Sequence, residues 1–348
     1  MKNTVYLNSN KLINADSLHY IKTLPDNSID LIATDPPYFR VKACKWDNQW
    51  GSESVYLSWL DEVLAEFWRV LKPAGSLYMF CGSRLAADTE ILVRGRFNVL
   101  NHIIWAKPSG PWRRMHKEDL RSYFPATERI IFADHYSGPL MPKGGTYAAK
   151  CSALKQNVFR PLIDYFRLAR VSLGVSAKAI NEATGRQMSS HWFSESQWQL
   201  PNAEQYAALQ KLFDQIATEK YQQGTLSRPH HDLVEEYQTL NRKYSELSLE
   251  YEALRRPFAV TADVPYTDVW TYPPVPYYPG KHPCEKPAEM MEHIIRSSSR
   301  PGDVVADFFM GSGTTIRAAI KLGRVGIGVE LEEERFNQTI EEIKELFT

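Results

Sequence analysis

The stretch DVVADFFMGSGTTIRAAIKLGRVGIGVE, residues 303–330, decides the fold that we expect for this chain of 348 residues. Residues 303–309 are mostly apolar, as in a buried strand, and residues 313–323 carry apolar side chains at helical spacing. Residues 324–330 read as a second strand. A strand, a helix and a strand in this order predict one unit of an open α/β sheet.

The turn of this unit, residues 307–315, has the position and the glycines of a ligand site. It is not a dinucleotide fingerprint, because Ile316 stands where the third glycine of G-x-G-x-x-G would fall, and it lacks the lysine of a phosphate-binding loop. Glu330 follows Gly311 by 19 positions (330 − 311), close to the ~20-residue offset at which an acidic side chain binds ribose hydroxyls. The pattern predicts a nucleoside-containing cofactor without a pyrophosphate. The alternative is a glycine turn required for packing, together with a surface glutamate.

Strand and helix patterns on both sides of this unit extend the predicted sheet. Strand-like runs occur at 31–35, 76–81, 97–107 and 129–133, and helical spacing occurs at 58–71, 288–299 and 334–347. From about 156 to 257, helical patterns and turns continue without a convincing strand. We therefore expect a doubly wound, open α/β sheet formed by residues 1–155 and 258–348, interrupted by an all-helical insert at 156–257.

The tetrapeptide Asp35-Pro36-Pro37-Tyr38 follows an apolar run, so it lies at the carboxyl end of a strand, where open α/β sheets place ligands. The two prolines fix the backbone and remove two N–H donors. What remains is a rigid set of acceptors, the Asp35 carboxylate and a main-chain carbonyl, beside the aromatic ring of Tyr38. This set suits a planar ring that bears an exocyclic amino group. The alternative is a strand that ends in a tight turn.

A third motif, His282-Pro283-Cys284-Glu285-Lys286-Pro287, taken alone reads as a simple turn before the helix at 288–299. Together the three motifs resemble those of the amino-methyltransferases of DNA. In that family Asp-Pro-Pro-Tyr is the catalytic motif, Phe-Met-Gly-Ser-Gly is the cofactor motif, and His-Pro-x-Glu-Lys-Pro precedes it. The order of the motifs is similar to the β-class circular arrangement, and the resemblance covers roughly 1–140 and 258–348.

The resemblance implies a Rossmann-like methyltransferase fold, S-adenosylmethionine as cofactor, and methyl transfer to adenine N6 or cytosine N4. It implies that Asp35, Pro36, Pro37 and Tyr38 hold the target base. The residues that it implies in cofactor binding are Asp16, Lys286, Asp307, Phe309, Gly311, Gly313, Thr314 and Glu330. Asp16 is the weaker assignment, because Ala15 replaces the glycine that is commoner in the family.

Aspartate at position 35 resembles the adenine-modifying members more than the N4-cytosine members. We therefore expect site-specific methylation of adenine N6 in double-stranded DNA, by a phage or bacterial enzyme of the kind found in restriction–modification systems. The target base must leave the helix stack. Cytosine-N4 methylation is the alternative among enzymes, and a DNA-binding regulator that has lost catalysis is the alternative outside them. The sequence does not reveal a partner nuclease.

Within the insert, residues 164–193 have the helix start and stop signals that are typical of a helix-turn-helix. One apolar helix ends near Gly174, Ser176 caps a second helix that stops at Gly185, and a third element follows. The pattern resembles repressor-type domains, so we expect the insert to recognise DNA, although a purely structural bundle shares it. The candidate side chains for base edges and phosphates are Arg186, Gln187, Ser189, Ser190 and His191.

Three further stretches complete the site that we expect. Residues 107–121 are basic, and Lys107, Arg113 and Arg114 are candidates for the phosphate backbone, with a solvated loop as the alternative. The loop 39–57, with its tryptophans, is expected to cover the active site. Leucines and tyrosines from Leu233 to Leu254 recur at intervals of four and three, over about three heptads. We favour an arm that folds back on the insert over pairing in a homodimer.

The bulk composition sets few limits. Forty-one basic and 41 acidic side chains give a net charge of zero, so DNA binding should rest on a local basic face. The polar N-terminus and the lack of an apolar run of ~18 residues predict neither a signal peptide nor a membrane span. The four scattered cysteines predict reduced thiols in a cytoplasmic protein and no metal site.

Overall fold

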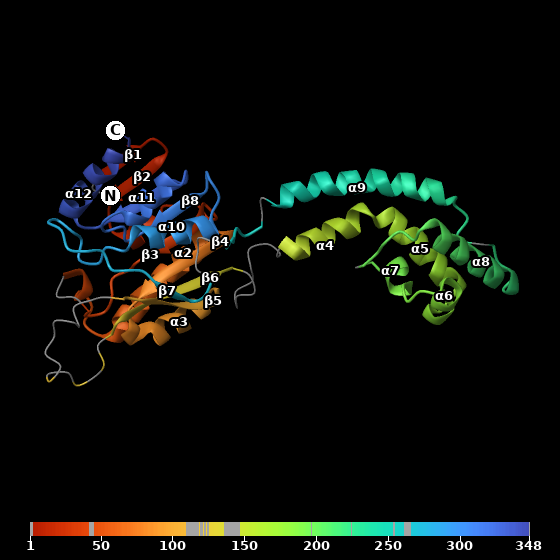
Figure 1. Ribbon diagram of the computed structural model, residues 1–348, viewed down its shortest axis with the longest axis horizontal. Coiled ribbons are helices and arrows are strands. Elements are labelled where there is room, and N and C mark those ends of the chain that lie inside the picture. Colours follow the sequence, from red (N-terminus) through yellow and green to blue (C-terminus); the bar gives the residue numbers. More distant parts are fainter. Residues whose placement is uncertain are drawn as a thin grey trace. The chain divides into compact units, whose positions relative to one another are not determined.

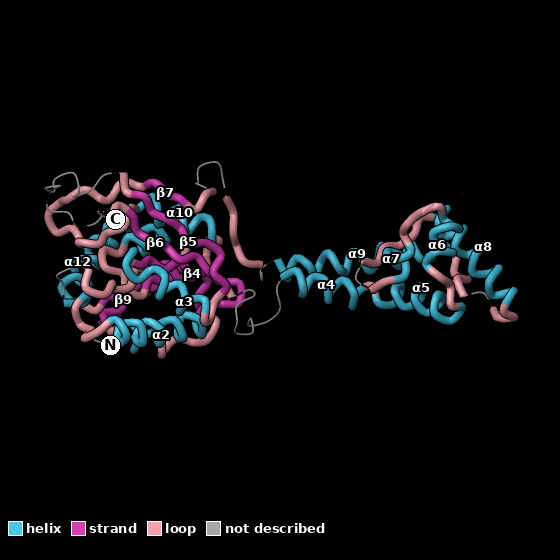
Figure 2. Tube along the Cα trace, turned by 90° about the horizontal axis from the view of Figure 1, so that it is seen from below, coloured by secondary structure: helices cyan, strands magenta, loops and turns pink. Residues whose placement is uncertain are grey.

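The computed structural model describes residues 3–41, 45–108, 118, 121, 123, 125–135, 147–195, 197–223, 225–252, 255–260 and 266–347. The chain divides into two compact units, one formed by Met1–Gly144 and Arg256–Thr348 and the other by Gly145–Arg255. The first unit is built around a sheet, whereas the described residues of the second form helices and connecting loops, without a strand (Figure 2). We call them the sheet unit and the helical unit.

In the sheet unit, the described strands form a nine-stranded sheet in the order β1-β2-β9-β8-β3-β4-β6-β5-β7. Figure 1 shows strands of this sheet with helices beside them. The strands from β2 to β4 in this order are mutually parallel, whereas β6 runs antiparallel to both β4 and β5. The bounds are β1 (Asn3–Leu7), β2 (Asn10–Asn14), β3 (Ile29–Thr34), β4 (Leu71–Cys81), β5 (Asn98–Ala106), β6 (Thr127–Asp134), β7 (Val269–Thr271), β8 (Val304–Asp307) and β9 (Val325–Glu330).

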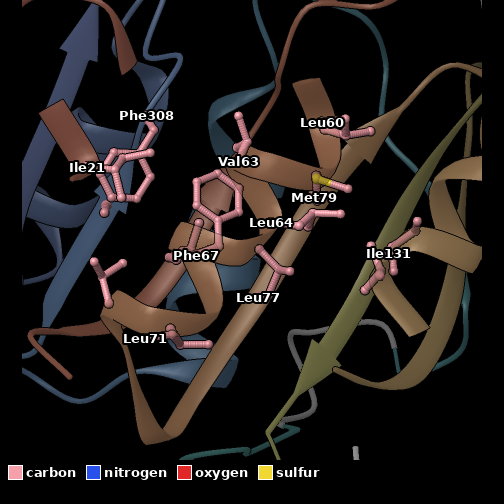
Figure 3. Packing of buried hydrophobic residues seen from close by; sticks show 14 of the residues in the cluster. Ile21, Leu60, Val63, Leu64, Phe67, Leu71, Leu77, Met79, Ile131 and Phe308 are labelled. Carbon is pink, nitrogen blue, oxygen red and sulfur yellow. The ribbon is translucent and has the colours of Figure 1, made fainter. Parts of the chain in front are cut away.

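Helices cover both faces of the sheet, because successive strand side chains point to opposite faces. On one face lie α1 (Ser17–Ile21), α2 (Glu53–Val70) and α3 (Ala86–Arg94), and Figure 3 shows Leu64 and Phe67 of α2 packed toward Leu77 of β4. The other face is covered by α10 (Ala288–Ser298), α11 (Thr314–Lys321) and α12 (Glu333–Lys344). The sheet is therefore doubly wound, which confirms the predicted fold class.

Two local differences from the expected elements have clear causes. Helix α2 begins at Glu53, earlier than expected, because the Ser52 hydroxyl accepts the Val55 N–H at 3.3 Å and caps it. Strand β4 begins at Leu71, so the Lys-Pro-Ala-Gly stretch 72–75 is part of a strand whose register with β3 is irregular. The sequence does not predict the short elements β7 and α3, because segments of this length show no clear periodicity of apolar residues.

The topological switch point of the sheet, where the strand order reverses, lies between β3 and β8. The chain passes from β3 through α2 to β4 on one face, and from β8 through α11 to β9 on the other. Because β3 and β8 are neighbours, their connections diverge at their carboxyl ends. Such a switch point opens a crevice that commonly binds ligands.

The helical unit contains α4 (Tyr147–Val158), α5 (Arg160–Leu173), α6 (Ala177–Thr184), α7 (Ser189–Phe193), α8 (Ala203–Glu219) and α9 (His230–Glu252). It begins before the expected boundary at 156, because α4 packs against α9. The predicted heptad seam of α9 packs on this unit's own core, with Leu233 fully buried and Tyr237, Leu240, Tyr244, Leu247 and Tyr251 against it. Leu254 lies outside the described residues.

No helix among the described residues is both long and apolar enough to cross a membrane.

Candidate active site

Four parallel strands end side by side at the edge of the sheet that carries the predicted motifs. Strands β2, β9, β8 and β3 are consecutive neighbours there, and the segments that follow them, together with residues of β5, β6 and 274–286, line a cavity of about 250 Å³. Of the predicted catalytic and cofactor residues, Gly313 is the one that does not line it. The lining residues among them are Asp16, Asp35, Pro36, Pro37, Tyr38, Lys286, Asp307, Phe309, Gly311, Thr314 and Glu330.

The Asp35 carboxylate is engaged at both of its oxygens. The Tyr38 hydroxyl donates to Oδ1 at 2.6 Å, and the Lys286 ammonium donates to Oδ2 at 2.5 Å. Burial raises the pKa of Asp35, the Lys286 charge partly lowers it, and the Glu128 charge raises it again. A substrate amine that binds this carboxylate must therefore share an oxygen with one of these donors or replace that donor. The sequence did not indicate that Asp35 already has these two partners.

Glu128, on β6, belongs to none of the predicted motifs. Its Oε2 lies 3.3 Å from Lys286 Nζ and 3.4 Å from the Tyr38 hydroxyl, and Lys107 pairs with its Oε1. Burial raises the pKa of Glu128, but Lys286 and Lys107 outweigh this and lower it to about 2. In sequence, Glu128 was only an acidic residue before the apolar run 129–133.

Lys107 was predicted to contact DNA phosphates, but the structure places it in the cavity wall. Its ammonium is paired with Glu128 and lies 4.6 Å from the centre of the Trp105 ring. These neighbours stabilise it as a partly buried cation. The other two candidates of this stretch, Arg113 and Arg114, lie outside the described residues.

The glycines of the turn after β8 have left-handed backbones, with φ of +48° at Gly311 and +70° at Gly313. A Cβ atom at Gly311 would lie 3.0 Å from the His282 ring, and one at Gly313 would lie 2.6 Å from Thr339 Cγ2. Packing against protein side chains therefore requires both glycines. Gly311 also donates its N–H to Glu330 Oε2 at 3.0 Å, which fixes the turn to the end of β9.

Asp307 and Thr314 hold this turn from within. Asp307 Oδ1 accepts the Thr34 hydroxyl at 2.7 Å and the Phe309 N–H at 3.1 Å, and the Thr314 hydroxyl lies 2.9 Å from that of Ser312. Burial raises the pKa of Asp307 to about 6, although these hydrogen bonds oppose the shift. The carboxylate thus links the ends of β3 and β8.

The segment after β2 is tied to the same turn. Asp16 Oδ1 accepts the His19 N–H at 2.8 Å and caps α1, and the Ser17 hydroxyl donates to the Phe308 carbonyl. Glu330 accepts the Glu332 N–H at Oε1, 2.8 Å away, and burial raises its pKa. Asp16 and Glu330 therefore present carboxylates at one end of the cavity.

The loop expected to cover the site contributes to it in part. Asp47, in the short helix η1 (Lys45–Asp47), accepts the Tyr38 N–H at 2.8 Å, and Trp46 stacks on His282 at 6.3 Å. Trp46 and Asp47 line the cavity. Trp50 instead packs on Tyr56 in the hydrophobic core, so it does not help to cover the active site.

In the helical unit, the helix ends expected for the helix-turn-helix are present. Helix α5 ends at Gly174, the Ser176 hydroxyl accepts the Ala179 N–H at 3.1 Å, and α6 ends at Gly185. Arg186, Gln187 and Ser190 are exposed, His191 is partly buried and Ser189 is buried. Gln187 is steadied by Asn181, whose amide donates to its Oε1 at 2.8 Å. Their role in DNA recognition stays a prediction.

The doubly wound sheet, with acidic residues at its carboxyl edge and an Asp-Pro-Pro-Tyr turn beside a glycine turn that lacks a phosphate-binding lysine, defines a Rossmann-like amino-methyltransferase. A family model for DNA methylases, N6_N4_Mtase, matches residues 29–341. The chain therefore belongs to the DNA methylase family.

Individual relatives are distant but span the chain. The DNA adenine methyltransferase YhdJ of Escherichia coli (strain K12) is 25% identical over 327 residues, which cover 93% of this chain and 79% of that protein. The type II methyltransferase M.BglII of Bacillus subtilis is 24% identical over 93% of this chain and 66% of its own length. The solved cytosine-N4-specific PvuII DNA methyltransferase shares the fold, with 15% identity, coverage of 97% and 91% of the two chains, and a TM-score of 0.51.

Proposed function

We propose that this DNA methylase transfers a methyl group from S-adenosylmethionine to N6 of adenine in double-stranded DNA. The observation that carries the proposal is that the Asp35–Tyr38 turn and the Phe309–Gly311 turn line one cavity, at the adjacent ends of β3 and β8. Aspartate at position 35, and the adenine methyltransferase among the relatives, support adenine over cytosine.

The residues at the cofactor end of the cavity fit a nucleoside. Asp16 and Glu330 offer carboxylate oxygens to hydroxyl groups, and Phe309 offers an apolar ring. The turn at 307–315 contains no lysine, as suits a cofactor without a pyrophosphate. When bound, S-adenosylmethionine supplies a methyl group that is activated by the positive charge of its sulfonium.

At the other end of the cavity, the Asp35 carboxylate and a main-chain carbonyl of the two prolines accept hydrogens of the target amine. This orients the nitrogen lone pair toward the methyl donor, while Tyr38 stacks on the base. The amine becomes cationic when it is methylated and then readily loses a proton. Catalysis therefore consists mainly of alignment and of charge stabilisation, and needs no strong base.

The helical unit is proposed to choose the target sequence. The exposed side chains of Arg186, Gln187 and Ser190 lie between and on the two short helices α6 and α7. Such side chains can reach base edges in the major groove. A single chain is the proposed unit for this contact, because the apolar seam of α9 is already packed on α4 and its neighbours.

The test is to incubate DNA with the protein and labelled S-adenosylmethionine, digest the DNA to nucleosides, and identify the product by mass. N6-methyladenine is expected, and Asp35→Ala should abolish it. N4-methylcytosine alone would overturn the choice of base in favour of the PvuII-like activity. Label transfer that survives in Asp35→Ala would place the active site elsewhere, and no transfer by the wild type would favour a DNA-binding regulator.

A further inference from the structure

We propose that Glu128 is a positioning residue, which takes over the Lys286 ammonium when a substrate amine approaches Asp35. This inference rests on the proposed transfer to an exocyclic amine. Glu128 itself belongs to none of the three sequence motifs.

Such a residue is needed because both oxygens of the Asp35 carboxylate already accept hydrogen bonds. Its Oδ2 accepts Lys286 at 2.5 Å and its Oδ1 accepts the Tyr38 hydroxyl at 2.6 Å. An amine that binds this carboxylate competes with both donors. Lys286 is the stronger competitor, because the ammonium and the carboxylate both carry a full charge, whereas the Tyr38 hydroxyl is neutral.

Lys286 cannot simply withdraw, because its side chain is buried and the penalty for an unpaired buried charge is large. Apart from Asp35, its polar neighbours among the described contacts are the Cys284 carbonyl at 3.5 Å and Glu128 Oε2 at 3.3 Å. Only Glu128 offers a full negative charge. A small displacement of Nζ therefore exchanges one carboxylate for the other.

The position of Glu128 is fixed for this exchange. It lies on β6 and is paired with Trp105 of β5, and the pairing of β6 with β4 begins at the next residue, Arg129. Lys107 holds its second oxygen, Oε1, so that Oε2 remains directed at Lys286. The group of Asp35, Glu128, Lys107 and Lys286 contains two cations and two anions, so the exchange leaves its net charge unchanged.

The first test compares the nearly isosteric Glu128→Gln with Glu128→Asp, which keeps the charge. We expect Glu128→Gln to lower the single-turnover methylation rate, at saturating DNA and cofactor, by roughly 10–100-fold, because a misplacement of about 1 Å at the reacting groups can cost about 100-fold. The dissociation constant of S-adenosylhomocysteine, measured by calorimetry, should stay unchanged. Glu128→Asp should be faster than Glu128→Gln, because charge and not shape is required.

Glu90→Gln is the matched control. The Glu90 side chain is 20% exposed against 19% for Glu128, and it also binds two basic side chains, Arg94 and His102, but it does not line the cavity. It should keep the wild-type rate. A Glu128→Gln rate equal to that of the wild type, or a Glu128→Asp rate no higher than that of Glu128→Gln, would overturn the inference.

The second test needs no turnover. In a crystal structure of the wild type with duplex substrate and S-adenosylhomocysteine, we expect Lys286 Nζ to lie closer to Glu128 than to Asp35. Lys286 still on Asp35, with the amine held elsewhere, would overturn the inference while the proposed function stood. A wild type that methylates no DNA would overturn the proposed function, and the inference with it.

Discussion

Lys286 Nζ lies 2.5 Å from Asp35 Oδ2, although the two residues stand 251 positions apart in the chain. The pair joins the segment before α10 to the end of β3 and fixes the carboxylate of the Asp-Pro-Pro-Tyr turn. Glu128 shares the same ammonium. The site is therefore held by a largely buried group of charged side chains, in which each pairing depends on the others.

Lys286→Met should destabilise the fold, because it leaves two partly buried carboxylates without their shared cation. We expect the free energy of unfolding to fall by about 3 kcal/mol at neutral pH, measured by urea denaturation. Lys72→Met is the control, since Lys72 pairs with Asp30 at 2.8 Å but its side chain is 40% exposed. It should cost less than about 1 kcal/mol, and equal losses would contradict the prediction.

Asp47→Ala should displace Tyr38. The substitution removes the acceptor of the Tyr38 N–H and should cost about 1–3 kcal/mol of stability. Because the Tyr38 ring is proposed to hold the target base, the single-turnover methylation rate should fall while S-adenosylhomocysteine binds as before. Asp47→Asn keeps an oxygen acceptor and should retain most of the rate. A rate as low as that of the alanine variant would argue against this hydrogen bond.

Gly313→Ala and Gly323→Ala form a matched pair, since the two glycines have φ of +70° and +73°. A Cβ at Gly323 meets nothing within 4 Å, whereas one at Gly313 would lie 2.6 Å from Thr339 Cγ2. Gly323→Ala should cost about 1 kcal/mol from the left-handed backbone alone. Gly313→Ala should cost about 3 kcal/mol, because crowding is added. Equal shifts of the urea midpoint in the two variants would show that α12 moves away from the added methyl group at position 313 without a cost in stability.

Asp307 should make stability fall as the pH rises from about 4 to 6. Its pKa in the folded chain is about 6, against an ordinary value of 3.8, so in this range the folded state keeps a proton that the unfolded state has released. The stabilisation is present below pH 4 and lost above pH 6. At 1.36 kcal/mol per pKa unit it amounts to about 3 kcal/mol.

Asp307→Asn tests this, since the amide oxygen can accept the same two hydrogen bonds. The unfolding free energy of the variant, minus that of the wild type, should increase by about 2 kcal/mol between pH 4 and pH 7, because part of the total is already lost at pH 4. Urea denaturation over this range provides the measurement. A difference that does not change with pH would mean that Asp307 is ionised throughout.

Arg186→Ala should weaken methylation of the preferred sites, by about tenfold if the guanidinium contacts a base edge. The readout is modification-sensitive sequencing of genomic DNA from cells that express each variant. Lys211→Ala, an exposed substitution on α8, is the control and should leave the pattern intact. Loss of S-adenosylhomocysteine binding in Arg186→Ala would indicate misfolding instead of lost recognition.

The local signals in the sequence were enough for the fold class and for the places of the motifs. The strand, turn and helix at 303–323 are visible because apolar periods and glycines act over a few neighbouring residues. For the same reason, the caps at Gly174, Ser176 and Gly185 in the helical unit could be read directly. The placement of Asp35 at a strand end followed from the apolar run before it.

Only the tertiary structure decided which side chains pair with one another in the site. Glu128 enters the site because the register of β6 against β5 sets it opposite Trp105, beside Lys107 at the end of β5. The same register places Lys107 in the cavity wall, whereas its predicted contact with DNA phosphates stays a prediction. Pairings of this kind depend on which strands become neighbours, and charged side chains far apart in sequence carry no periodic or capping signal that would reveal their partners.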